Sequence, residues 1–208
     1  MSRGSETSER IVCAARKLFA KKGYEGATMA EIAREAEITE GAIYRHFTDK
    51  KELFMACVAP VVEEAFSRSL AEVGEAAGIR GMMRAIVEVR LDLLERHLES
   101  FDILFSEVLH RQELQDLLWE RIKTQIEGVG SALEKVRRAG HLSRRPNLLI
   151  LGLGMTVAMW AILSFRNGRG LKDFLGIPTT REHLADDFTE FMLYGIAGEP
   201  AGRDHRWR

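Results

Sequence analysis

Three helix-start signals follow one another closely near the beginning of the chain, and they restrict this part to short helices joined by tight turns. Thr28-Met-Ala-Glu31 is a capping box, in which two side chains each satisfy a free backbone N–H group. Thr39 can cap a second helix, and Asp49-Lys-Lys-Glu52 repeats the capping chemistry for another. The first of these helices should end at about Ala36, shortly before Thr39. Two brief helices with so short a connection predict a helix-turn-helix.

Apolar residues recur at helical spacing along the rest of the chain, and no stretch shows the alternation typical of a strand. One helix precedes the capping box and should end near Gly23, after a basic pair. The chain is therefore predicted to be all-α. Further helices are expected from Lys50 past Pro60, from Met82 to Leu98, from a cap at Ser100 to His110, from Leu117 to Gly140, from Pro146 to Gly168, and from a cap at Thr179 to Ile196.

The second helix of a helix-turn-helix lies in the DNA major groove, and its N-terminal part contacts base edges. Gly41 lowers helix stability by about 1 kcal/mol relative to alanine, so close approach of a partner explains it better than folding does. Arg45 can pair with guanine, whereas Tyr44 and His46 can reach a phosphate or a thymine methyl group. The predicted DNA surface is formed by Gly41, Ala42, Tyr44, Arg45 and His46, with Ile43 and Phe47 facing inward and with Thr28 and Lys50 as flanking phosphate contacts.

Two features leave this interpretation open. The exposed positions can be an ordinary solvated helix face, as such residues are on most helices. Glu40 is repelled by phosphate unless it accepts a hydrogen bond from a cytosine amino group or lies outside the groove. A ligand-binding module without specific DNA binding is therefore one alternative.

The stretch ATMAEIAREAEITEGAIYRHFTDKKELF, residues 27–54, closely resembles the DNA-binding domain of the tetracycline-repressor (TetR) family of transcriptional regulators. The resemblance covers roughly residues 8 to 56 and beyond them extends only to size and helical pattern. It implies a homodimer, a palindromic operator on double-stranded DNA and a small-molecule effector. The matching positions are Gly23-Tyr24, Thr28, Ile32-Ala33, Gly41, Ile43, Tyr44, His46, Phe47, Lys50 and Leu53.

By the same resemblance, Ala42, Tyr44, Arg45, His46 and Lys50 fall on positions that commonly contact DNA, and Thr28 and Thr39 fall on phosphate-contacting ones. We expect a three-helix DNA-binding domain over residues 1–55. The fourth helix should join it to a helical effector-binding and dimerisation domain over residues 56–208. A repressor released by its effector is the usual arrangement, although the sequence does not distinguish a repressor from an activator.

Net charge and the number and spacing of cysteines exclude several other classes of protein. The net charge of -1 and a pI of about 6.6 argue against a protein that coats nucleic acid indiscriminately, so any DNA surface must be local. Cys13 and Cys57 lack the spacing of a zinc site, and buried, reduced thiols are expected. No cofactor motif is present, and no signal peptide is evident at the N-terminus, so we expect a cytoplasmic protein.

The uncharged run over residues 148–164 is the one candidate for a membrane segment. At about 1.5 Å per residue it is shorter than the roughly 30 Å hydrocarbon core, so we expect a buried helix and no membrane partner. In the TetR family the last two long helices pair with their copies in a four-helix dimer interface, and the resemblance implies the same interface here. The small residues of this run and the apolar residues of the last helix suit such packing. The alternative is an internal core. The interface residues are Gly154, Ala158, Phe188, Phe191 and Met192, with Gly152 and Ala161 beside them.

A ligand pocket is indicated by flexible and aromatic side chains, although each of them can equally belong to the core. An apolar or amphipathic effector is expected, with His110, Arg90 or Gln112 as candidate polar anchors. The candidate lining residues are Met83, Phe105, His110, Trp119, Met159 and Trp160.

An enzyme is the alternative from another class. Glu107 and His110 have the spacing of one half of a di-iron site in a helical bundle, but such a site needs a second pair. We therefore predict no catalytic or metal-binding residues. Pro60 lies inside the predicted fourth helix, where it either transmits effector-driven movement to the DNA-binding helices or forms a static kink.

Overall fold

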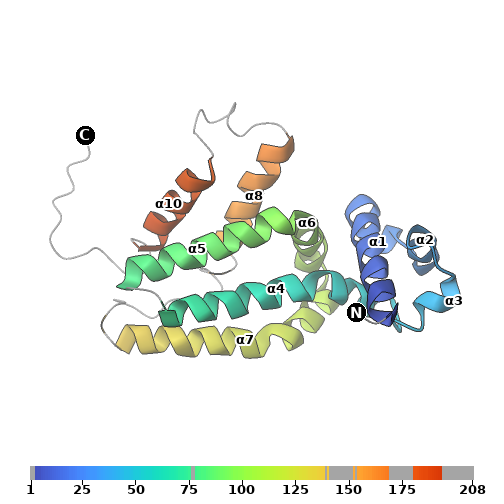
Figure 1. Ribbon diagram of the computed structural model, residues 1–208, viewed down its shortest axis with the longest axis horizontal. Helices are drawn as coiled ribbons and strands as arrows, with labels where there is room; N and C mark the ends of the chain where they lie inside the picture. Colours follow the sequence, from blue (N-terminus) through green and yellow to red (C-terminus); the bar gives the residue numbers. More distant parts are fainter. Residues whose placement is uncertain are drawn as a thin grey trace. The chain divides into compact units, whose positions relative to one another are not determined.

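The computed structural model describes residues 3–75, 78–138, 140, 152, 154–168 and 180–193, and within these ranges no residue lies in a strand (Figure 1). The predicted all-α fold is confirmed. The α-helices are α1 (Arg3–Gly26), α2 (Met29–Glu35), α3 (Glu40–Ile43), α4 (Lys50–Glu75), α5 (Gly78–Arg96), α6 (Leu98–Glu107), α7 (Gln112–Arg138), α8 (Met155–Gly168) and α10 (Arg181–Met192), and η1 (Val108–His110) is a 3₁₀ helix.

The helices form two compact units. The first unit comprises Met1–Glu64 and Arg96–Thr124, and the second comprises Ala65–Glu95 and Gln125–Arg208. The helices α4, α5 and α7 each contribute residues to both units. The expected boundary between residues 55 and 56 stays a prediction.

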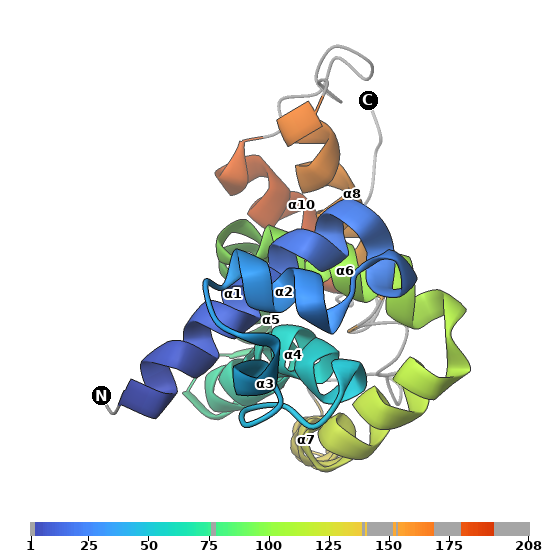
Figure 2. The same ribbon diagram turned by 90° about the vertical axis from the view of Figure 1, so that its right-hand side faces the viewer.

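The first unit has an apolar core beneath α1, α2 and α3. Figure 2 shows the ribbons of these three helices close together. Ile11, Ile32 and Ile43 are each fully buried there. Three aromatic rings, those of Phe19, Tyr24 and Phe54, pack against one another with centres 5.2 to 5.8 Å apart. Offset and edge-on contacts of this kind stabilise a small core beyond the area they bury. This shared core holds α2 and α3 in place against α1.

The end of α1 is fixed by a buried carboxylate on α6. Gly23 has φ 73, a left-handed conformation that glycine adopts without steric cost. The backbone N–H of Tyr24 then donates to Glu107 Oε1 at 3.0 Å. A Cβ on Gly23 would stand 2.8 Å from that same oxygen. The backbone conformation therefore favours glycine at this position, and a larger residue would also displace the Glu107 carboxylate.

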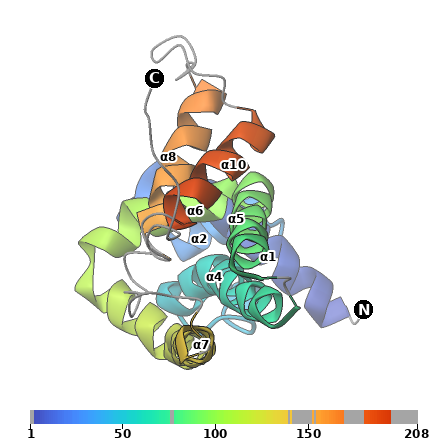
Figure 3. The ribbon, with the colours of Figure 1, turned by 90° about the vertical axis from the view of Figure 1, so that its left-hand side faces the viewer.

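The second unit contains α8 and α10 beside α5, and Figure 3 shows these three helices together. Ion pairs tie α10 to α5. Arg181 pairs with Glu88 at 3.0 Å and also with Glu95, and Arg84 bridges Glu88 and Asp186. The apolar stripe of α5 is buried on its other side, so α5 has one charged face and one core face.

Several sequence-based expectations need correction. Ser100 is not the cap of α6, because the helix begins at Leu98 after His97 and Ser100 is buried inside it. Thr180 caps α10 by accepting from the His183 amide at 3.3 Å, whereas the expected cap Thr179 lies outside the described residues. Cys13 is exposed and only Cys57 is buried.

Two further expectations concern segments with unusual composition. Pro60 is exposed and lies inside α4, so the helix continues past it as expected, and its suggested part in signalling stays a prediction. None of the helices in the described ranges combines the length and the apolar character that a membrane span requires. Residues 148–151 and 153 of the uncharged run lie outside the description.

Candidate nucleic-acid interface

The start of α2 is held by the predicted capping box, which is confirmed. The Thr28 hydroxyl accepts from the Glu31 amide at 3.2 Å, and the Glu31 carboxylate accepts from the Thr28 amide at 3.3 Å. The other Glu31 oxygen accepts from Lys22 Nζ at 2.7 Å. The hydrogen bond from Lys22, followed by that from Thr28, lowers the pKa of Glu31. Since the Thr28 amide is already bonded, its hydroxyl proton is the group that can donate to a phosphate.

The turn between α2 and α3 depends on Glu37, which has φ 54. A left-handed residue lets the chain reverse directly after a helix, although glycine adopts this conformation at lower cost than glutamate. Hydrogen bonds to α1 and α2 close the turn. Arg10 of α1 donates to the Ala36 carbonyl at 2.5 Å, and the Ile38 amide donates to the Ala33 carbonyl at 3.0 Å.

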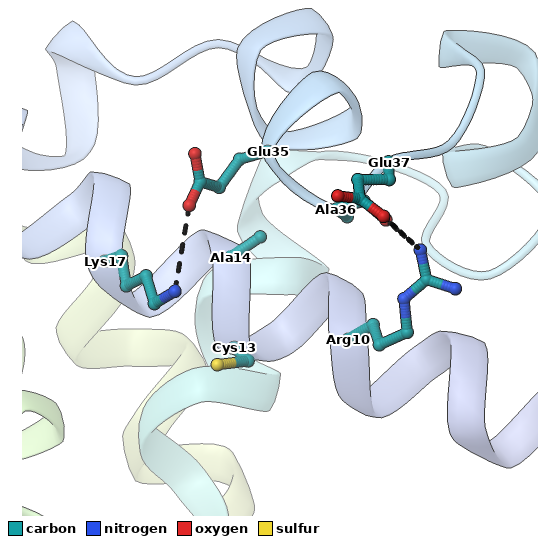
Figure 4. Close-up of a pocket in the computed structure, with 7 residues that line it drawn as sticks. All are labelled: Arg10, Cys13, Ala14, Lys17, Glu35, Ala36 and Glu37. Atoms are coloured by element: carbon teal, nitrogen blue, oxygen red, sulfur yellow. Dashed lines mark hydrogen bonds and ion pairs between the residues drawn. The ribbon is translucent and has the colours of Figure 1, made fainter.

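A small open pocket lies between α1 and the end of α2, and its lining includes Cys13 (Figure 4). Lys17 pairs with Glu35 at 3.7 Å across it, and Arg10 lies 4.0 Å from Glu37. The volume is about 180 Å³, whereas ligand pockets usually exceed about 300 Å³. We therefore interpret this hollow as part of the turn and not as an effector site.

The helix α3 begins at Glu40, and Thr39 caps it by accepting from the Ala42 amide at 3.2 Å. Regular α-helix ends at Ile43, which is shorter than the sequence indicated. The amides of Arg45 and His46 donate three residues back, at 3.2 and 3.0 Å, so the chain continues as tight turns. The helix ends early because the chain must change direction before α4, which begins at Lys50.

The outward face of α3 and the following turns is open. Ile43 is buried and Phe47 is 7% exposed, whereas Tyr44 is 49% exposed and Arg45 is also exposed. A Cβ on Gly41 would meet no atom within 4 Å, and the φ of this residue is not positive. Neither the backbone nor internal packing therefore requires glycine there. The predicted contact residues Gly41, Ala42, Tyr44, Arg45 and His46 adjoin one another at the surface, Ala42 and His46 being half-buried.

Lys50 lies at the start of α4 and is held by groups of the preceding segment. Its Nζ donates to the Ala27 carbonyl at 3.3 Å, lies 3.9 Å from the Glu25 carboxylate and sits 4.4 Å from the centre of the Tyr24 ring. The side chain is 23% exposed. The ammonium is thus oriented before any phosphate arrives, and a phosphate would compete with Glu25 for it.

The predicted cap of α4 is confirmed and extended. The Glu52 amide donates to Asp49 at 2.8 Å, as expected for an N-cap. In addition, the amide and the hydroxyl of Thr48 donate to the Glu52 carboxylate at 2.6 and 2.7 Å. The turn after α3 is therefore locked by side chains on both sides. Glu40 is exposed and, among the described residues, forms no ion pair.

The predicted effector-pocket residues divide between the two units. Phe105, His110 and Trp119 belong to the first unit, where Phe105 is buried and the other two are exposed. Met83, Met159 and Trp160 belong to the second, where both methionines are buried. Of the candidate polar anchors, His110 and Gln112 are exposed, whereas Arg90 is buried. The pocket stays a prediction.

The predicted dimer residues lie on α8, just before it, and on α10. Gly154 and Ala158, one helical turn apart, are exposed, and a Cβ on Gly154 would meet nothing within 4 Å. Phe191 is 65% exposed. Phe188 is half-buried and Met192 is buried within the chain itself. Exposed small and aromatic residues on neighbouring helices can accept a partner helix.

The pair that motivated an enzyme alternative has other partners. Glu107 is buried and accepts from the Tyr24 amide and from Arg111 Nε at 2.9 Å. His110 is exposed, and its Nδ1 lies 3.0 Å from the Ser106 carbonyl oxygen. In the described ranges no group of metal-ligating side chains has the arrangement of a metal site. Glu107 and His110 thus bond to different partners in this structure.

Sequence reasoning missed the role of Glu107 in the first unit. Arg111, which bonds Glu107, also donates to Glu25 at 2.9 Å, and its guanidinium lies 5.7 Å from the Tyr24 ring centre. Burial, followed by the carboxylates of Glu113, Glu25 and Asp49, raises the pKa of Tyr24 to about 12. The only sequence signal was the spacing of Glu107 and Arg111 by one helical turn, which many surface pairs share.

The segment that contains the candidate DNA surface is similar to known proteins. Residues 11–57 match the family model described as bacterial regulatory proteins, tetR family. This segment contains most of α1, all of α2 and α3, and the start of α4. It therefore includes every side chain proposed to contact DNA.

Relatives and solved structures extend the similarity. The uncharacterized HTH-type transcriptional regulator TtgW of Pseudomonas putida is 34% identical over 114 residues, which are 53% of this chain and 78% of TtgW. The repressor AcnR of Corynebacterium diphtheriae is 32% identical over 124 residues, 55% of this chain and 63% of AcnR. Several curated relatives are matched over only about half to two thirds of their length. The ketosteroid transcriptional regulator KstR2 of Mycobacterium tuberculosis shares the fold, with TM-score 0.64, 22% identity, and coverage of 95% of this chain and 96% of that chain.

Proposed function

Because the chain belongs to the tetR family of bacterial regulatory proteins, we propose that it is a DNA-binding transcriptional regulator acting in the cytoplasm. In this proposal a homodimer binds an inverted-repeat operator, and a small apolar or amphipathic effector changes its affinity for DNA. Repression relieved by the effector is the direction we favour, since AcnR is named a repressor. The N-terminal domain over residues 1–55 would bind DNA, and residues 56–208 would bind the effector and the partner.

The observation that carries the proposal is the open surface at Gly41. A short helix is capped at Thr39, locked after His46 by the Thr48–Glu52 bonds, and left without a neighbour where a Cβ would stand. Such a surface suits a groove wall that approaches the backbone closely. Arg45 presents a guanidinium beside it, which can donate two hydrogen bonds to one guanine.

The flanks supply the positioning contacts. The hydroxyls of Thr28 and Thr39 and the ammonium of Lys50 lie at the starts of three successive helices. Phosphate contacts of this kind fix the register of the protein on DNA without specifying a sequence. The exposed Glu40 would then either accept from a cytosine amino group or lie outside the groove.

Selection of bound duplexes from a random library tests the proposal. We expect wild-type protein to recover an inverted repeat, and Arg45→Ala to lose preference at one base pair in each half-site, by about 1–3 kcal/mol. Lys123→Ala, on α7, removes the same charge outside the proposed surface and should recover the wild-type motif. Weak, salt-sensitive and sequence-indifferent binding by the wild type would overturn the proposal and favour a ligand-binding module.

A further inference from the structure

A buried arginine lies in the middle of α5, wholly within the second unit. Arg90 is only 8% exposed. Its Nη1 donates to the hydroxyl of Thr156 on α8 at 3.1 Å, and its guanidinium carbon lies 5.5 Å from the ring centre of Phe66 on α4. Three helices therefore fix the position and the plane of one guanidinium group.

Among the described residues, no carboxylate balances the charge of Arg90. In the parts of the chain that the structure describes, Arg90 forms no ion pair, and its buried Nε has no hydrogen-bond partner. Arg84 on the same helix, by contrast, pairs with Glu88 and Asp186. Burial lowers the pKa of Arg90 to about 10, so the group is still a cation near neutral pH. An isolated buried cation destabilises a protein unless an anion binds beside it.

The free edge of the guanidinium is well defined. Thr156 holds Nη1, and the hydroxyl of Thr156 in turn donates to the Gly152 carbonyl at 2.6 Å. The edge formed by Nε and Nη2 is left for another acceptor. A Cβ on Gly152 would stand 3.8 Å from Nη2, an ordinary contact distance, so Gly152 lies directly beside this edge. Two parallel N–H donors at this spacing match the two oxygens of a carboxylate.

From this geometry we infer that Arg90 binds the carboxylate of the effector, which is an amphipathic molecule with one anionic head and an apolar body. The inference rests on the proposed function, because it specifies the ligand of the same effector domain. The carboxylate pairs with Nε and Nη2, and the apolar body lies among the buried side chains of the second unit, such as Met83 and Met159. Low local polarity strengthens such a charge pair relative to water.

The test measures binding of straight-chain carboxylates, from hexanoate to palmitate, to the full-length protein without DNA, each beside the alcohol of equal chain length. We expect at least one carboxylate to bind the wild type about tenfold or more tightly than its alcohol, as a charge-assisted pair requires. Arg90→Met should lose this preference and unfold at a higher temperature than the wild type without ligand. Arg90→Lys keeps the positive charge but lacks the two parallel N–H donors of a guanidinium, so it should retain only part of the carboxylate preference.

Arg84→Met is the matched control, because it removes an ion-paired arginine from the same helix and should keep the carboxylate preference. Equal binding of carboxylates and alcohols throughout the series, or an undiminished preference in both Arg90 variants, would overturn the inference. Operator selection distinguishes the two proposals. A wild type that shows no carboxylate preference but still recovers an inverted repeat removes this inference alone, whereas Arg90-dependent carboxylate binding without sequence-specific DNA binding removes the proposed regulator.

Discussion

Two glycines of the first unit carry opposite physical requirements. Gly23 is left-handed and faces the Glu107 carboxylate, whereas Gly41 has no positive φ and open space beside it. We expect Gly23→Ala to lower the free energy of unfolding by about 1–2 kcal/mol, because alanine is strained at this φ. Gly41→Ala should raise it by up to about 1 kcal/mol, because alanine favours helix. Urea unfolding followed by circular dichroism measures both.

The same two variants separate folding from DNA contact. If the Gly41 surface meets DNA, Gly41→Ala should weaken operator binding even though the protein becomes more stable. A variant that is both more stable and fully active in DNA binding would show that close approach does not explain Gly41. Gly23→Ala is the comparison, since any loss of binding there should follow its loss of stability.

The two cysteines differ in exposure, and alkylation should distinguish them. Cys13 is exposed, whereas burial raises the pKa of Cys57 to about 12 and therefore keeps its thiol protonated at neutral pH. Since the thiolate is the nucleophile, iodoacetamide should label Cys13 in the native protein and Cys57 only after unfolding. Mass spectrometry of labelled peptides gives the answer, and Cys13→Ser should show no native labelling. Rapid native labelling at Cys57 would contradict the buried position.

At the scale of elements, the capping box of α2 should make stability depend on pH. The hydrogen bond from Lys22 lowers the pKa of Glu31 below its ordinary 4.5, so the folded protein favours the ionised carboxylate. This contribution is present above pH 4.5 and is lost as the pH falls through the native pKa. Glu31→Gln should therefore be less stable than the wild type near neutral pH, and the difference should shrink below pH 4.5.

Denaturant unfolding at several pH values measures this effect, and a second background tests its cause. In Lys22→Met the main partner of Glu31 is absent, so Glu31→Gln should change the pH dependence much less there. The explanation fails if the wild type and Glu31→Gln differ by the same amount at every pH, since the difference would then have no electrostatic origin.

The elements that the sequence predicted well are those fixed by local chemistry. The caps at Thr28, Thr39 and Asp49 depend on side chains within three residues of the amides they bond, so their spacing alone indicates them. The end of α3 and the start of α6 were predicted less well. The end of α3 is set by the cap of the following helix α4. At the start of α6 no side chain caps the helix, so Ser100 was a misleading signal.

Contacts between distant segments account for most of what was missed. Glu107 bonds a residue of α1 far away in the sequence, and nothing in its own neighbourhood distinguishes it from a surface carboxylate. The proposed DNA surface could be delineated from the sequence because its residues lie on one continuous stretch of chain. The proposed effector site depends on residues of several helices, and Arg90 became distinguishable from His110 and Gln112 only through its burial and its unpaired Nε.

At the scale of the whole molecule, the proposed dimerisation would link the proposed DNA and effector surfaces. Phe191 is 65% exposed on α10, and Gly154 and Ala158 leave an open surface at the neighbouring helix. A second copy packed on these residues would remove a large apolar side chain from water. Two-fold symmetry would then place two copies of α3 roughly 34 Å apart, one in each of two successive major grooves.

Phe191→Asp should therefore yield a folded monomer at concentrations where the wild type sediments as a dimer. Its affinity for an inverted repeat should fall by roughly a hundredfold, toward that for one half-site, because the second contact is no longer intramolecular. Glu182→Gln, at the start of the same helix, changes a surface charge without removing apolar area and should stay dimeric. If Phe191→Asp stayed dimeric with unchanged operator affinity, the dimer interface would lie on other helices. The distance between the two DNA-binding surfaces would then be set by those helices.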